Sequence, residues 1–137
     1  MKTIQQMKDL TQIFDEVYDY DPEAIYDGEY FRVEKAGKYN FADETGKVAF
    51  DDWFDQADDI MYADVTFADV ERDGKYNMIV FDYPNIPRLL TDTWYDTPLQ
   101  FVDDYERITS RDGIWLVLSA ETGRVIRDAT KDDLNRI

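Results

Sequence analysis

The tetrapeptide Gly37-Lys38-Tyr39-Asn40 returns unchanged as Gly74-Lys75-Tyr76-Asn77, 37 positions further along the chain. A third, diverged copy places its glycine at Gly113, 39 positions after Gly74. Self-similarity at a period of this length is the sequence signature of repeat proteins, in which one unit is too small to bury its own apolar face. We therefore expect about three repeats of 37–39 residues that share a core with their neighbours.

The residues that follow each of these glycines alternate as a β-hairpin strand requires. The second and fourth positions after the glycine are apolar or aromatic in all three copies, which is typical of one buried strand face. These positions hold Tyr39 and Phe41, Tyr76 and Met78, and Trp115 and Val117. Single glycines between short strands predict turns with positive φ. The predicted turn glycines are Gly37, Gly46, Gly74, Gly113 and Gly123.

Two further motifs follow the hairpin and also recur. The turn Glu44–Lys47 (Glu-Thr-Gly-Lys) returns as Glu121–Arg124. The corner Trp53–Asp55 (Trp-Phe-Asp) returns as Trp94–Asp96 (Trp-Tyr-Asp). Short strands joined by such turns predict antiparallel β-meander units. The expected fold class is mainly β, within a β-rich α+β architecture.

An amphipathic helix is expected before the first repeat. Apolar residues recur at three- and four-residue spacing from Ile4 to Tyr18, and Asp21-Pro22 ends the pattern. This periodicity predicts a helix over about Thr3–Asp19. The chain is expected to form a single domain, 1–137. Its parts are a helix and turn (1–28), repeat one (29–65), repeat two (66–104), and a partial third repeat with a tail (105–137).

Composition excludes several kinds of chemistry. The chain has no Cys and no His, which removes disulfides, thiolate chemistry, Ser-His-Asp triads and imidazole–zinc sites. No apolar run approaches the ~20 residues of a membrane span, and the N-terminus lacks the apolar core of a signal peptide. We therefore expect a cytoplasmic protein of a bacterium or a phage-infected host cell, with no cofactor.

Paired carboxylates are the remaining candidates for catalysis or metal binding. Adjacent acids on a strand point to opposite faces, so such doublets do not converge automatically. A calcium-like alternation of acids begins at Asp19, but Ala24 and Tyr30 occupy the positions of the sharp-turn glycine and the bidentate acid. We expect no enzymatic activity and no metal site, with a carboxylate-based hydrolase as the weakest hypothesis. The doublets are Asp51-Asp52, Asp58-Asp59, Asp103-Asp104 and Asp132-Asp133.

The net charge is −16, from 31 acidic and 15 basic residues. Such a charge repels nucleic acid and anionic membranes, and it favours a protein partner with a basic surface. Between Lys47 and Arg72 there are eight acids and no base. This stretch is either a solubility surface or an acidic ridge at the first repeat junction, with an aromatic anchor inside it. The predicted binding residues are Asp51, Asp52, Trp53, Phe54, Asp55, Asp58, Asp59, Asp64 and Asp69.

The first copy resembles the bacterial WG repeat, also called the KWG repeat. The resemblance covers the first copy well, the second partly and the third weakly. The glycine that follows the aromatic residue in that family is Asn40, Asn77 and Leu116 here. The resemblance implies small antiparallel β units and an interaction role, and it carries over no catalytic residue. The matching residues are Phe31, Val33, Gly37, Lys38, Tyr39, Phe41, Asp43, Gly46, Lys47, Phe50, Phe54, Asp55 and Ala57.

Two functions remain open at this point. The first is a non-enzymatic, acidic WG-repeat-like module for protein–protein interaction in a bacterium or bacteriophage. The second is a DNA-mimicking inhibitor of a nucleic-acid-binding host defence protein, of the anti-restriction or anti-CRISPR type. Rows of Asp on a rigid sheet would imitate part of the phosphate field, which carries one charge per ~1.7 Å of duplex. Binding by charge mimicry should weaken steeply with salt, whereas a mainly aromatic interface should not.

Overall fold

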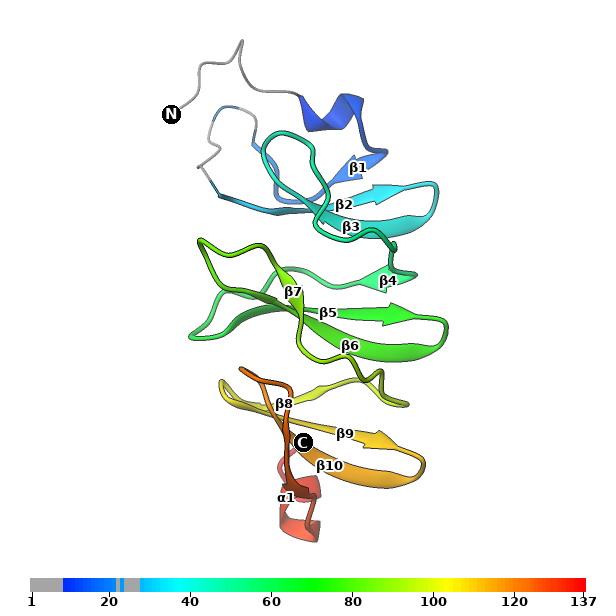
Figure 1. Ribbon diagram of the computed structural model, residues 1–137, viewed down its shortest axis with the longest axis vertical. Helices are drawn as coiled ribbons and strands as arrows, with labels where there is room; N and C mark the ends of the chain where they lie inside the picture. The colour runs from blue at the N-terminus through cyan, green and yellow to red at the C-terminus, as the bar shows by residue number, and fades with distance from the viewer. Residues whose placement is uncertain (1–8, 22, 24–27) are drawn as a thin grey trace.

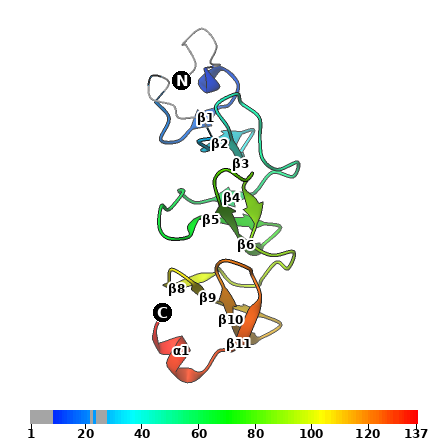
Figure 2. The ribbon, with the colours of Figure 1, turned by 60° about the vertical axis from the view of Figure 1, so that its left-hand side comes forward.

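The computed structural model describes residues 9–21, 23 and 28–137, and it shows three small antiparallel sheets stacked along the long axis (Figures 1 and 2). The expectation of a mainly β fold is confirmed. The first sheet has the order β1 (Glu16–Val17), β2 (Phe31–Lys35), β3 (Lys38–Ala42). The second has the order β4 (Gln56–Ala57), β5 (Thr66–Arg72), β6 (Lys75–Phe81), β7 (Arg88–Leu89). The third has the order β11 (Val125–Asp128), β10 (Ile114–Ser119), β9 (Glu106–Arg111), β8 (Gln100–Asp103).

The predicted N-terminal helix is not found in the described part of its range. Residues 1–8 lie outside the described residues. Leu10–Gln12 form one turn of 3₁₀ helix (η2) that Asp9 caps, and Glu16–Val17 pair with β2 as strand β1. Leu10 and Phe14, part of the apolar stripe, are buried against the first sheet. Tertiary pairing with a neighbouring strand therefore overrides the helical periodicity of this segment.

The equivalent hairpins β2–β3, β5–β6 and β9–β10 of the three sheets each have a two-residue loop. Both loop residues have positive φ in all three hairpins, which is the type I′ turn that matches the right-handed twist of the strands. The loop glycines Gly37, Gly74 and Gly113 have φ of 78°, 74° and 79°. The residues before them also have positive φ, and these are Ala36 (53°), Asp73 (54°) and Asp112 (54°).

The second turn of the first and third repeats also centres on a glycine. Gly46 and Gly123 have φ of 89° and 74°. In the first repeat the side chain of Asp43 accepts hydrogen bonds from the backbone N–H groups of Thr45 and Lys47, at 2.9 and 3.1 Å. Asp43, directly before Glu44-Thr45-Gly46, therefore satisfies backbone N–H groups of its own turn.

The aromatic-Asp corner carries the chain from one sheet to the next. Phe54 and Tyr39 exchange two backbone hydrogen bonds of 2.8 Å, so the corner first closes its own hairpin. The N–H of Asp55 then donates to a carbonyl of β5 in the following sheet, also at 2.8 Å. Tyr95 and Tyr76 make the same exchange at 2.9 Å in the second repeat. Each corner is therefore shared by two neighbouring sheets.

The segment Phe14-Asp15 forms a corner of the same kind ahead of the first hairpin. The N–H of Asp15 donates to Glu34 O at 2.9 Å, and its carboxylate accepts the N–H of Ala36 at 2.8 Å. Strand β1 therefore adds to the first sheet as β4 adds to the second. The sequence did not reveal this corner, because its apolar residues also match a helical period.

The third repeat ends differently. The N–H of Ala129 donates to Trp115 O at 2.9 Å, the place that Phe54 and Tyr95 take in the earlier repeats. The next residue, Thr130, caps the short helix α1 (Lys131–Asn135) and forms a capping box with Asp133. Arg127 pairs with Asp133 at 2.7 Å and holds the pKa of that carboxyl at about 2. A helix cap thus replaces the corner aspartate in the last unit.

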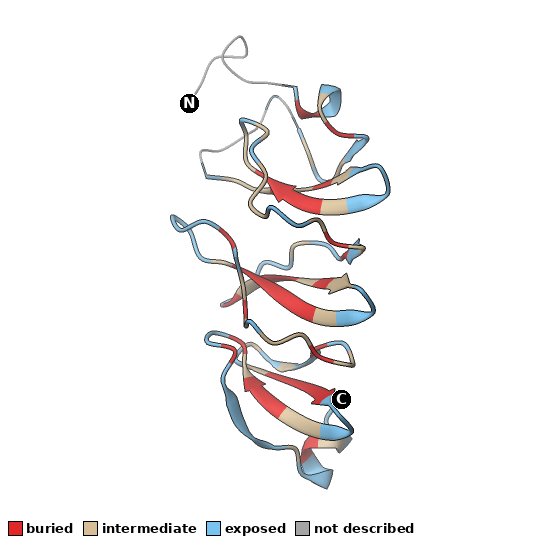
Figure 3. Ribbon diagram, turned by 45° about the vertical axis from the view of Figure 1, so that its right-hand side comes forward, coloured by how far each residue is buried: buried red, intermediate tan, exposed pale blue. Residues whose placement is uncertain are grey.

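Buried residues form three clusters, and two of them span a junction between sheets (Figure 3). Neighbouring repeats therefore share a core, as their small size requires. The cluster of the first sheet is Leu10, Phe14, Phe31, Val33 and Ala42. The first junction buries Phe41, Phe54, Ala57, Ala68, Val70 and Ile79. The second buries Val65, Phe67, Met78, Val80, Leu90, Tyr95, Leu99, Leu118 and Ala120.

Asn40 and Asn77, which follow the hairpin aromatic residue in the first two repeats, are buried and hydrogen-bonded. Asn40 has no exposed surface; its side-chain amide donates to Phe50 O at 2.8 Å, and its oxygen accepts the N–H of Phe41. Asn77 likewise donates to Thr91 O at 2.9 Å. Each asparagine therefore ties its hairpin to the returning loop.

None of the helices in the described residues is long and apolar enough to cross a membrane.

Candidate functional site

The structure divides the predicted acidic ridge into parts with different roles. Phe54 has no exposed surface and packs among Phe41, Trp94 and the guanidinium of Arg72. The prediction of Phe54 as an exposed anchor is therefore wrong, because the corner needs this ring in the shared core. Trp53 is half-buried, with its ring centroid 6.2 Å from that of Phe14.

Asp55 serves the fold and is already paired. Its carboxylate forms an ion pair with Lys38 and accepts the backbone N–H of Asp73 at 2.8 Å. The hydrogen bond from Lys38, followed by that from Asp73, holds the pKa of Asp55 below its usual range. Asp96 repeats the arrangement with Lys75, and its pKa is lowered in the same way. The acidic stretch between Lys47 and Arg72 contains no base, but Lys38 on β3 neutralises the charge of its Asp55.

Asp51 and Asp52 are exposed and lie beside a structural contact. Arg72 of β5 donates from Nη2 to the backbone oxygen of Asp52 at 2.8 Å. Its guanidinium lies 4.6 Å from the ring centroid of Phe54 and 4.9 Å from that of Trp94. This part of the stretch therefore joins the first two repeats. Its two carboxylates do not line the cavities described below.

Three of the remaining ridge acids, Asp58, Asp59 and Asp69, line a cavity of about 670 Å³, which we call the acidic cavity. Its lining comes from all three sheets: Arg32 on β2, the loop after β4, β5, and the residues around β8. Arg32 pairs with Asp59 at 2.8 Å across this cavity lining. The carboxylates of the lining are Asp58, Asp59, Asp69 and Asp104, and its apolar residues are Met61, Tyr62, Ala63, Phe67, Leu99 and Phe101.

Asp69 is the most perturbed acid of the described residues. Burial, followed by repulsion from Asp58, raises its pKa to about 6, and Arg107 opposes the shift. Its Oδ1 is buried without a hydrogen-bond partner. A partly buried carboxylate with one buried, unsatisfied oxygen beside a cavity is costly to ionise, and such groups cluster at functional sites.

Arg107 lies behind the aromatic wall of the acidic cavity. It has no exposed surface, and its guanidinium lies 4.5 Å from the ring centroid of Phe67 and 4.7 Å from that of Phe101. Its Nη1 donates to the backbone oxygens of Asp103 and Glu106, at 2.7 and 2.9 Å. Burial lowers the pKa of the guanidinium. The arginine therefore supports the wall, and its side chain makes no hydrogen bond to Asp69 among those the structure shows.

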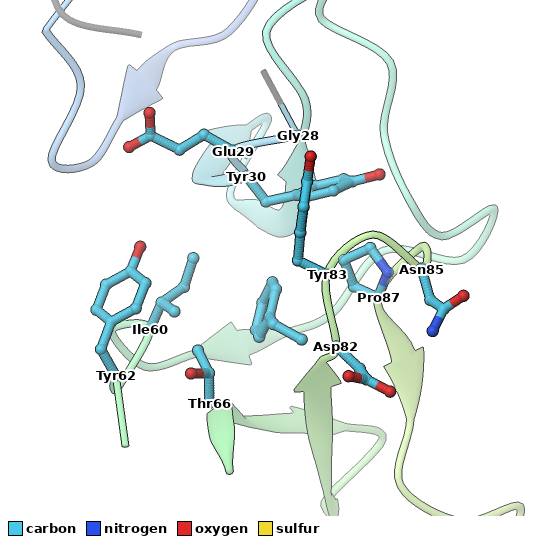
Figure 4. A pocket seen from close by; sticks show the side chains of 11 residues that line it. Gly28, Glu29, Tyr30, Ile60, Tyr62, Thr66, Asp82, Tyr83, Asn85 and Pro87 are labelled. Atoms are coloured by element: carbon cyan, nitrogen blue, oxygen red, sulfur yellow. The ribbon is translucent and has the colours of Figure 1, made fainter. Parts of the chain in front are cut away.

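A smaller cavity of about 250 Å³ lies between the first two sheets (Figure 4). Tyr30 and Tyr83 line its upper edge in this view, and Ile60 and Tyr62 lie to the left. The ring of Tyr30 is 6.4 Å from that of Phe81. Tyr62 also lines the acidic cavity, so its loop separates the two hollows.

Several large apolar side chains remain exposed beside the acidic cavity. The exposed fractions are 54% for Met61, 75% for Tyr62, 52% for Phe101 and 50% for Tyr105. The hydroxyl of Tyr105 donates to Asp64, at 3.2 Å, which places this predicted acid on the same side. Residues 58–64 with Phe101, Asp104 and Tyr105 are called the loop face below. Exposed apolar groups within a polar rim are typical of interaction surfaces.

The sequence interpretation missed the apolar part of this face. It selected Trp53 and Phe54 because they lie inside the acidic stretch, but both also belong to the repeated corner motif, and repetition reflects a structural need. The available signal was Met61-Tyr62, an apolar pair in an acidic loop that has no counterpart in the other repeats. Phe101 and Asp104 come from a distant segment, and only the stacking of repeats brings them to this loop.

The chemistry of the loop face is that of cation binding and apolar contact. Among the described residues, no group of three or more His, Cys, Asp or Glu is placed to hold a metal ion. No family model, curated protein or solved structure matches the chain in the comparisons with known proteins.

Proposed function

We propose that this chain is a non-enzymatic protein–protein interaction module that binds a basic partner through the loop face. The observation that carries the proposal is the acidic cavity, where four carboxylates surround apolar walls next to exposed Met61 and Tyr62. Negative charge steers a basic partner and accelerates its association. Aromatic and apolar side chains inside a polar rim then slow dissociation.

The proposal extends to the family and the setting of the protein. We propose a diverged WG-repeat-like module that acts in the cytoplasm of a bacterium or a phage-infected cell. Three equivalent hairpins with corner acids at Asp55 and Asp96 support the repeat interpretation. The resemblance of the first copy to the family, with the net charge of −16, supports an interaction role.

Affinity capture with matched variants tests this function. The full chain is immobilised, exposed to bacterial lysate, and compared with the double variant Met61→Ala/Tyr62→Ala. The control is Ile114→Ala/Ile126→Ala, since these side chains are also about half exposed but lie on β10 and β11. A specific partner, identified by mass spectrometry, should be lost with the first variant and kept with the control. Loss with both variants, or with neither, contradicts the loop face as the binding surface.

A DNA mimic is a second candidate, because the net charge of −16 is spread over an elongated stack (Figure 1). Such a protein would occupy the nucleic-acid channel of its target. Duplex DNA would then compete for the captured partner, and affinity would fall steeply with salt. A partner that DNA does not displace, and that tolerates salt, supports the interaction module instead.

A further inference from the structure

The first repeat junction shows how this fold holds a guanidinium group. Arg32 on β2 lies over the ring of Tyr18, with its guanidinium carbon 3.9 Å from the ring centroid. Its Nη1 donates to Ala57 O at 2.5 Å, and its Nη2 pairs with Asp59 at 2.8 Å. One side chain is therefore stacked, hydrogen-bonded and ion-paired between two repeats.

The second junction carries acids at the corresponding positions. Asp69 stands five residues before Gly74, as Arg32 stands five residues before Gly37. The backbone confirms this correspondence, because the N–H of Tyr18 donates to Arg32 O and the N–H of Asp58 donates to Asp69 O, both at 2.9 Å. Where the first junction has an arginine on an aromatic ring, the second therefore has two neighbouring carboxylates.

These two carboxylates have space beside them, and Arg107 acts on Asp69 only through its charge, with no hydrogen bond or ion pair among those the structure shows. Oδ1 of Asp69 is buried without a hydrogen-bond partner, and Arg107 directs its Nη1 to backbone oxygens instead. The acidic cavity lies beside them, with Phe67 and Phe101 as an aromatic wall. A guanidinium has weakly hydrated planar faces and a fork of donors, so it suits a site that combines rings with carboxylates better than an ammonium does.

We propose that the acidic cavity is an arginine-binding slot, which takes the guanidinium of a partner's side chain between Asp58 and Asp69 and against Phe101. This inference rests on the proposed function and names the group that the loop face recognises. The partner arginine would supply the charge that Arg32 supplies within the chain at the first junction.

A titration with a small probe tests the slot without any partner protein. N-acetyl-arginine amide and N-acetyl-lysine amide are added to the ¹⁵N-labelled full chain, and amide shifts are followed by NMR. Arginine should give saturable shifts at residues 58–69 and 99–104, with tighter binding than lysine. Asp69→Asn should weaken arginine binding by about tenfold, the scale of one charge-assisted hydrogen bond. Asp51→Asn makes the same charge change away from the cavity and should leave binding unchanged.

The possible outcomes separate the slot from the proposed function. Shifts that are spread over all acids, equal binding of the two probes, or an unaffected Asp69→Asn variant would overturn the slot. A partner that needs Met61 and Tyr62 but ignores Asp69→Asn would likewise overturn the slot and leave the interaction function standing. If the chain binds the arginine probe but its partner does not depend on Met61 and Tyr62, the slot would stand and the proposed function would be overturned. Thermal melts verify folding, and Phe101→Ala, at an exposed ring, provides a second variant that should also weaken arginine binding.

Discussion

The carboxylate of Asp55, in the corner of the first repeat, accepts the backbone N–H of Asp73, in the hairpin turn of the second, at 2.8 Å. The same carboxylate pairs with Lys38 of its own repeat. One side chain therefore fastens two hairpin tips that project from the stack. Asp96 does the same for the next junction, where it accepts the N–H of Asp112 at 2.8 Å. This clamp gives a physical reason for the aspartate of the repeated corner motif.

Removing a corner charge should loosen the stack. Asp55→Asn and Asp96→Asn should each lower the melting temperature, because the lysine pair and the charge-assisted bond to the turn are lost. Asp52→Asn is the matched control, since this side chain is exposed and makes no such clamp. Thermal melts followed by circular dichroism provide the measurement. Equal melting temperatures for all three variants and the unmodified chain would rule out the clamp.

The clamps also predict a pH dependence. Hydrogen bonds hold the pKa of Asp55 and Asp96 below the usual 3.8, so the folded state binds their protons more weakly than the unfolded state. This stabilisation is present above pH 3.8 and is lost as the pH falls through the lower, folded-state pKa. The double variant Asp55→Asn/Asp96→Asn should therefore lose less stability than the unmodified chain over that acidic range in urea titrations.

Two glycines with the same φ of 74° should differ in their tolerance of alanine. A Cβ at Gly74 would meet nothing within 4 Å, so Gly74→Ala should cost only the left-handed backbone strain, about 1–2 kcal/mol. A Cβ at Gly123 would lie 2.4 Å from Leu90 O, which is backbone and cannot move aside cheaply. Gly123→Ala should therefore destabilise the protein distinctly more in urea denaturation. Equal losses of unfolding free energy for Gly74→Ala and Gly123→Ala would contradict the close approach of Gly123 to the backbone of Leu90.

The first hairpin holds the least suitable residue of its three turns. Ala36 has φ of 53° at the position that Asp73 and Asp112 fill in the other repeats. Asparagine tolerates this conformation better than alanine, so Ala36→Asn should raise the free energy of unfolding by about 0.5–1 kcal/mol. The reciprocal change Asp73→Ala keeps the backbone N–H that bonds to Asp55 and should lower stability by a similar amount. Chemical denaturation of both variants measures these two changes in the free energy of unfolding.

Asp69 should oppose stability at neutral pH. Its folded-state pKa of about 6 lies above the usual 3.8 of an aspartate, so the folded state holds this proton more tightly. The stabilisation from this group is therefore complete below about pH 4 and is lost as the pH rises through about 6. Asp69→Asn should stabilise the protein at pH 7, by up to about 3 kcal/mol from the linkage of two pKa units. The same substitution should also remove the change in stability that this group causes between pH 4 and 6. If Asp69→Asn is less stable than the unmodified chain at pH 7, the charge of Asp69 is not destabilised by burial.

Charge reversal on the loop face should act mainly on the association rate. Asp58→Lys/Asp104→Lys should slow association with the basic partner strongly at low salt and only slightly at high salt. Asp51→Lys/Asp52→Lys makes the same net change outside the acidic cavity and should have a much smaller effect. Stopped-flow measurements at several salt concentrations compare the two. Equal slowing by both pairs would mean that only the overall charge matters.

The sequence by itself determined the repeating parts of the fold. Gly37 and Gly74 fixed hairpins of two-residue loops, because only a few residues accept positive φ in tight turns. Alternating apolar residues predicted one buried strand face, and Phe41 and Met78 are buried, but the opposite face is buried as well at Asn40 and Asn77. Both signals are local, so they can be read from the sequence without knowledge of the tertiary packing.

Only the tertiary structure decided the ends of the stack and the candidate site. The segment Phe14–Val17 follows a helical period but joins the first sheet, because β2 offers a strand edge and the core a place for Phe14. Asp55 and Asp69 look alike in the acidic stretch, yet one faces Lys38 and the other a cavity beside Phe101. Asp69 lies on β5 of the second sheet and Phe101 on β8 of the third, so the surroundings of Asp69 depend on how the sheets stack. The chemistry of a carboxylate is set by the groups around it, and here stacking supplies those groups.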